Sequence, residues 1–155
     1  MKSKVATGML VALAVVLSIS MSKGVASAKD SPERSGQLHV VKNCDNYNGQ
    51  AGGSCMITSS NVSRLNNATA FYDQAYGVPA PATGAMLDSN VVLYVGENDW
   101  AVGRCTLGPS SIGLCTFSDG FGDLAGFHAR LRVAPAGGNN YTWDGPYSFN
   151  REFGE

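Results

Sequence analysis

Charge is sparse in this chain, and neither sign dominates. Aspartate, glutamate, lysine and arginine make up 15% of the 155 residues, and the formal net charge is −1, whereas about 25% charged residues is usual in soluble domains. The lack of a basic excess argues against a nucleic-acid-binding protein, which would cluster Lys and Arg. The apolar fraction of 44% argues against a disordered chain, and the length suits one domain.

The familiar catalytic and cofactor motifs are also missing. The chain has no nucleophile elbow, no P-loop and no dinucleotide fingerprint, and it has no Cys-x-x-Cys pair that would indicate a metal site. Its two histidines, His39 and His128, lie between apolar neighbours in alternating runs, and each is expected on the polar face of a strand rather than in a catalytic triad. No metal and no organic cofactor is expected, and a hydrolase or an oxidoreductase is disfavoured.

One long apolar run is present, and it lies at the N-terminus. Lys2 and Lys4 precede the apolar run Met9–Leu17, and residues 26–28 read Ala-Ser-Ala, which is the small-x-small pattern that signal peptidase cleaves. The run is shorter than the ~20 residues that a membrane-spanning helix needs. Residues 1–28 are therefore predicted to be a signal peptide, which makes the protein secreted, either periplasmic or extracellular, with no membrane anchor after cleavage.

The mature chain after cleavage is predicted to be mildly acidic. It keeps eight basic and twelve acidic residues, a formal charge of −4. Residues 29–36 are polar and are expected to form a flexible tail, and residues 37–155 are expected to form a single domain.

Four cysteines remain in the mature chain, and export would carry them to an oxidising compartment. Cys105 and Cys115 flank the turn signal Gly-Pro-Ser-Ser at residues 108–111. If two strands pair symmetrically about Ser110, these cysteines face each other at a distance that suits a disulfide. Cys44 and Cys55 bracket a polar, glycine-containing loop that would be closed by a second bridge. Two structural disulfides are predicted, with free thiols as the alternative.

Short β-rich runs separated by Gly, Pro, Asn, Asp and Ser fill the rest of the chain. In 127–133, apolar and polar residues alternate strictly, as in a strand with one wet face. Eight strands in a small barrel or sandwich are therefore predicted. The predicted ranges are 37–43, 55–60, 68–73, 90–95, 100–107, 113–118, 125–134 and 141–149, and residues 76–84, with two prolines and two glycines, are predicted to be a loop.

Candidate functional residues are few. Glu97 and Asp99 stand beside Trp100 after an apolar strand; paired acids can divide acid and base roles, although a β-turn explains the same residues. With His128 they are the catalytic candidates. Aromatic side chains could line a ligand pocket, stack on a sugar or fill the core, and the candidates for ligand binding are Tyr94, Trp100, Tyr141, Trp143 and Tyr147.

The segment SDGFGDLAGFHA, residues 118–129, resembles the glycine-rich turn and following strand of the allene oxide cyclase and dirigent barrels. Gly120 and Gly122 match two glycines of the Gly-Gly-Thr-Gly-x-aromatic pattern in those families, while Leu124 replaces the aromatic residue. Residues 141–149 suit the closing strand of bacterial relatives, so that the match covers about residues 113–149. The resemblance implies an eight-stranded antiparallel barrel around an apolar cavity, often oligomeric, that steers a small molecule to one product without a cofactor. No catalytic residue of those families has an alignable counterpart here.

Two classes of function follow, and the size of the barrel interior separates them. A barrel that binds a small apolar ligand and steers its cyclisation or isomerisation needs a dry pocket of roughly 300 Å³ or more. The alternative is a non-catalytic binding module for a glycan, a lipid or a protein partner, or a structural or inhibitory barrel filled by its own side chains.

Overall fold

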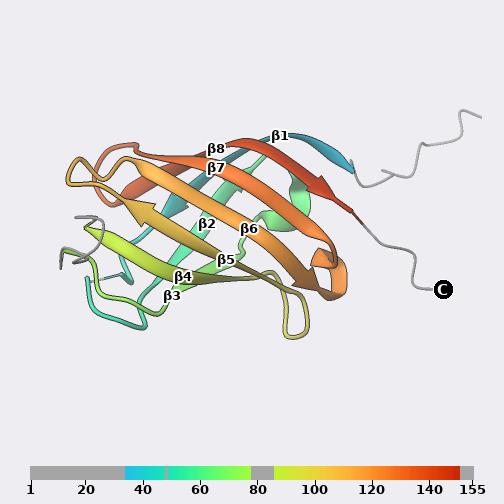
Figure 1. The fold of residues 1–155 in the computed structure, drawn as a ribbon, viewed down its shortest axis with the longest axis horizontal. Coiled ribbons are helices and arrows are strands. Elements are labelled where there is room, and N and C mark those ends of the chain that lie inside the picture. Colours follow the sequence, from blue (N-terminus) through green and yellow to red (C-terminus); the bar gives the residue numbers. More distant parts are fainter. Residues whose placement is uncertain (1–33, 48, 78–85, 151–155) are drawn as a thin grey trace, which may run out of the picture. The chain divides into compact units, whose positions relative to one another are not determined.

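The computed structural model describes residues 34–47, 49–77 and 86–150. In this part of the chain eight antiparallel strands form a closed barrel, in which each strand pairs with the next and β1 pairs with β8 (Figure 1). None of the described helices is long and apolar enough to cross a membrane. The strands are β1 (Ser35–Asn43), β2 (Ser54–Ser60), β3 (Thr69–Tyr72), β4 (Leu87–Tyr94), β5 (Trp100–Leu107), β6 (Gly113–Phe121), β7 (Phe127–Pro135) and β8 (Asn140–Phe149), with short 3-10 helices η1 (Ser63–Leu65) and η2 (Gly122–Leu124).

The predicted eight-stranded all-β barrel is confirmed, with differences at the strand ends. β1 begins at Ser35, so Ser35 and Gly36, which the sequence assigns to the tail, pair with Ser148 and Tyr147 of β8. The hydrogen bonds that extend β1 come from a strand more than 100 residues later, and local composition does not reveal them. The predicted signal peptide and most of the predicted 76–84 loop lie outside the described residues.

The glycine-rich segment differs from the expected tight turn. β6 continues to Phe121, and Gly120 lies within it, opposite Ala101. A Cβ atom on Gly120 would lie 2.2 Å from the carbonyl oxygen of Leu124, so this glycine allows close backbone packing rather than a turn. The turn starts at Gly122, whose φ of +64° is one that glycine adopts readily.

Both disulfides form as predicted. Cys105 lies opposite Cys115 across β5 and β6 and is bonded to it. Cys44, directly after β1, is bonded to Cys55 at the start of β2. Their presence is consistent with an oxidising compartment, while export itself stays a prediction.

Large side chains fill the interior of the barrel. On β7 the alternation is as predicted, because Phe127, Leu131 and Val133 are buried whereas His128 and Arg130 are exposed. Aromatic rings pack against one another at centroid distances of 5.1–6.5 Å around Phe127. The half of the barrel interior around Phe127 is therefore filled by side chains, and we call it the solid half. Its rings are those of Phe117, Phe127, Trp143, Tyr147 and Phe149.

Candidate functional site

A small pocket opens at the end of the barrel where β1, β3, β5 and β7 finish, on the left in Figure 1. Its volume is about 90 Å³, or about three times the ~30 Å³ that one water molecule occupies in the liquid. Asn139 is exposed at its rim. The lining residues are Lys42, Cys44, Tyr47, Gly49, Cys55, Tyr72, Tyr76, Leu87, Leu107, Asn139 and Tyr141.

Lys42 is the unusual member of this lining. The side chains of Leu38, Val40 and Lys42 share the inward face of β1, since successive side chains of a strand alternate between its faces. The lysine is 4% exposed. Lysine is almost never fully buried unless it is paired, and none of the residues that line the described pocket is acidic.

Aromatic groups take the place of a carboxylate around the amine. Lys42 Nζ donates a hydrogen bond to the hydroxyl of Tyr72. The same nitrogen lies 4.4 Å from the ring centroid of Trp143, 4.9 Å from that of Tyr72 and 5.8 Å from that of Tyr141. Cation–π attraction favours the charged amine, but burial lowers the pKa of Lys42 to about 7, because burial penalises the charged form. Near neutral pH both the charged and the neutral form of the Lys42 amine are therefore populated.

Tyrosines form the wall of the pocket. The rings of Tyr47 and Tyr72 stack at a centroid distance of 5.3 Å, and the Tyr47 hydroxyl donates to the carbonyl oxygen of Gln74 at 2.7 Å. The hydroxyl oxygen of Tyr76 lies 2.7 Å from Ser111 Oγ. Burial raises the pKa of Tyr47 to about 12 and raises that of Tyr72 as well, so both phenols keep their protons at neutral pH.

A glycine makes room for this wall. A Cβ atom on Gly53 would lie 2.0 Å from Cδ2 of Tyr47, so any larger residue at position 53 displaces the Tyr47 ring. The Cys44–Cys55 disulfide closes the same loop and contributes two of the lining residues. The loop between β1 and β2 is therefore shaped around the pocket.

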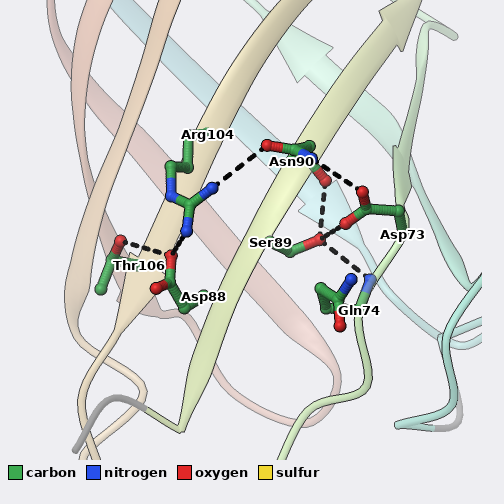
Figure 2. A network of polar contacts seen from close by, with 7 residues as sticks. All are labelled: Asp73, Gln74, Asp88, Ser89, Asn90, Arg104 and Thr106. Carbon is green, nitrogen blue, oxygen red and sulfur yellow. Dashed lines mark hydrogen bonds and ion pairs between the residues drawn. The ribbon is translucent and has the colours of Figure 1, made fainter. Parts of the chain in front are cut away.

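A polar network fixes the chain that follows β3 (Figure 2). The hydroxyl of the buried Ser89 lies 2.8 Å from Asp73 Oδ1 and accepts the backbone N–H of Gln74 at 3.1 Å. Burial raises the pKa of Asp73, but hydrogen bonds from Ser89 and Asn90 outweigh this and lower it. Because the carbonyl of Gln74 holds the Tyr47 hydroxyl, the network positions part of the pocket wall.

The same network continues across the outer face of β4 and β5 (Figure 2). Arg104 pairs with Asp88 at 2.8 Å and donates to Asn90 Oδ1 at 3.2 Å. These side chains are partly exposed, so the ion pair contributes little energy. They connect the Ser89 network on β4 to Arg104 on the neighbouring strand β5.

The five aromatic residues predicted to bind ligand lie in three places, which are the pocket, the solid half of the barrel and the outer surface. Tyr141 lines the pocket. Trp143 lies deeper, is 1% exposed and packs edge-on against Phe117, while Tyr147 belongs to the solid half of the barrel. Tyr141 and Trp143 lie on the same inward face of β8, since both rings approach Lys42.

Tyr94 and Trp100 lie outside the barrel instead. They are opposite each other on β4 and β5, and Trp100 stacks on Phe121 of β6 at a centroid distance of 5.9 Å. Phe121 is 56% exposed and Tyr94 is 43% exposed. These three residues form an outer aromatic row, separated from the pocket by the barrel wall.

The candidate acids and histidines occupy ordinary structural positions. Asp99 accepts the backbone N–H of Asp123 at 2.8 Å, so it joins the β4–β5 turn to η2, and Glu97 is exposed in that turn. His128 is exposed on the outer face of β7. His39 Nδ1 lies 2.5 Å from Asp144 Oδ1 on the outer face of β1 and β8. The turn and polar-face explanations therefore account for these residues.

Sequence reasoning missed the residues that build the pocket. Lys42, Tyr47, Tyr72 and Tyr76 are absent from the predicted site. One signal was available, because Lys42 continues the inward alternation of Leu38 and Val40, where a charged residue is unexpected. The three tyrosines carry no comparable pattern, because the barrel brings them together from separate loops and strands.

Comparisons of the chain with protein-family models, with curated proteins and with solved structures find no match.

Proposed function

We propose that this protein is a secreted binding barrel that holds a small ligand, or the small end of a larger one, in the Lys42 pocket. One observation carries the proposal: a buried amine faces a cavity walled by tyrosines, and none of the described residues that line this cavity is acidic. Burying a lysine here costs folding free energy because the amine loses its hydration, whereas an apolar residue would fill the barrel without that penalty. We therefore infer that the amine contacts a ligand. The chemistry of the wall suits a ligand with an apolar body and one oxygen acceptor.

The volume of the pocket limits what it holds. At about 90 Å³ it is well below the roughly 300 Å³ expected of a pocket for a drug-sized ligand. Trp143 and Phe117 occupy the space behind it. Binding a single ring or a short chain is therefore favoured over enclosing and cyclising a polyene. The closed eight-stranded barrel supports the allene oxide cyclase and dirigent resemblance as a proposal for the fold family, and catalysis by this site is not needed for the binding function.

The test is a titration of the mature protein with benzyl alcohol, followed by two-dimensional amide NMR. Benzyl alcohol offers one ring and one oxygen and cannot react with an amine. We expect saturable shifts centred on Lys42, Cys55 and Leu107. Shifts that are absent, or that do not saturate, would contradict the proposal.

Two variants serve as matched controls for this titration. Gly53→Ala displaces the Tyr47 ring and is expected to weaken binding about fivefold, because an aromatic contact contributes on the order of 1 kcal/mol. Tyr94→Ala removes an exposed ring on the outer surface and is expected to leave the affinity unchanged. Equal effects of the two variants would show that the ligand does not sit in this pocket.

The outer aromatic row favours a second candidate function, which is carbohydrate binding. Tyr94, Trp100 and Phe121 come from three adjacent strands; Tyr94 and Phe121 are exposed and Trp100 is half-buried, so a sugar can stack on the two exposed rings. If this row binds a glycan, the double variant Tyr94→Ala, Phe121→Ser should lose retention on an insoluble polysaccharide column while Gly53→Ala keeps it. If the wild type, the double variant and Gly53→Ala are all retained on the column, or if none of them is, carbohydrate binding by this row is rejected.

A further inference from the structure

We infer that Lys42 is a carbonyl-reactive lysine that captures a small aldehyde or ketone in the pocket as an imine. The inference rests on the proposed binding function and adds the chemical class of the ligand. It starts from an amine that is buried, faces a cavity and has a hydroxyl group beside it.

The nucleophile is available because the amine is partly neutral. A lysine in water, with a pKa near 10.4, is almost fully charged at neutral pH. Burial brings the pKa of Lys42 to about 7, so a substantial fraction of the molecules carry a free electron pair on Nζ at neutral pH. Desolvation in an apolar pocket is a recognised way of activating lysine for attack on carbonyl carbon.

The reaction balances with groups that the pocket contains. The Nζ electron pair attacks the carbonyl carbon, and the carbonyl π pair moves to oxygen, which takes up a proton as nitrogen loses one. The carbinolamine then expels its hydroxyl group as water while the nitrogen pair forms the C=N bond. The net change is amine plus carbonyl to imine plus water, with no oxidation or reduction.

Tyr72 and Trp143 are placed to assist these steps. The Tyr72 hydroxyl is in hydrogen-bond contact with Nζ, and it is protonated because burial raises its pKa, so it can relay a proton between nitrogen and the departing oxygen. The Trp143 ring, 4.4 Å from Nζ, would stabilise the protonated imine by cation–π attraction. Tyr72 is here a positioning and proton-relay group rather than a nucleophile.

The test is reductive trapping, in which the mature protein is incubated at neutral pH with propionaldehyde or benzaldehyde and sodium cyanoborohydride, then mapped by peptide mass spectrometry. The predicted mature chain contains one other lysine, Lys29, which acts as an internal control amine. We expect Lys42 to be alkylated about tenfold faster than the ε-amine of Lys29, because its neutral fraction is larger. Lys42→Arg should abolish the fast labelling, and Tyr72→Phe should slow it while leaving the rate at Lys29 unchanged.

Benzyl alcohol separates failure of this inference from failure of the binding function. Slow labelling of Lys42, at or below the rate of Lys29, together with saturable binding of benzyl alcohol, would overturn the imine and leave the binding function standing. Slow labelling with no binding of benzyl alcohol would overturn both. Fast labelling of Lys42 that benzyl alcohol suppresses would support both.

Discussion

Replacing Trp143 with alanine is expected to lower the free energy of unfolding by about 4 kcal/mol. The indole is 1% exposed, packs against Phe117 and lies under the Lys42 amine, so its removal leaves a cavity in the centre of the barrel. Such a loss is a large part of the 5–15 kcal/mol that typically stabilises a domain. Denaturant unfolding with both disulfides intact measures it.

Two variants show whether the loss comes from the core. Tyr94→Ala removes an exposed ring on the outer surface and should change the stability by less than about 0.5 kcal/mol. Trp143→Phe keeps most of the packing and also removes the indole N–H, which is buried without a hydrogen-bond partner among the described residues, so it should lose much less than alanine does. A Trp143→Ala protein as stable as the wild type would mean that the Trp143 ring does not pack in the core of the barrel.

Wild-type stability is expected to rise by about 3 kcal/mol between about pH 6.5 and about pH 9.5, relative to Lys42→Met. The folded chain holds the Lys42 proton with a pKa of about 7, whereas the ordinary value is 10.5. Between these values the unfolded chain binds more protons than the folded chain, so raising the pH favours folding. Methionine does not titrate, and its variant should be the more stable protein at neutral pH.

The measurement is denaturant unfolding of both proteins at several pH values, with the analysis stopped near pH 9.5. Above about pH 10 the raised pKa of Tyr47 acts with the opposite sign, because the unfolded chain loses its phenolic proton first. Arg130→Met removes an exposed cation and should follow the wild-type pH dependence. Parallel curves for wild type and Lys42→Met would show that Lys42 keeps its ordinary pKa and that the amine is not desolvated.

Local patterns in the sequence carried the prediction of the strands and disulfides. Strict alternation in β7 and the symmetric turn between Cys105 and Cys115 depend on neighbours within about a dozen residues, and such neighbours are visible in the sequence. The glycine-rich segment misled because Gly120 is explained by a close approach of the Leu124 backbone, which no local pattern reports. The aromatic candidates were chosen by residue type alone, and residue type does not distinguish the inside from the outside of a barrel.

By itself, the sequence determined that this chain forms eight strands with two disulfides, because hydrophobic alternation, turn residues and cysteine spacing act over short distances. The tertiary structure alone decided where the site is. Closure of β1 against β8 brings Lys42 beneath Trp143, and the curvature of the barrel brings it beside Tyr72 of β3, residues that lie 30 or more positions away in the chain. Burial in that company, rather than the residue type, lowers the pKa of the amine and makes the pocket chemically distinct.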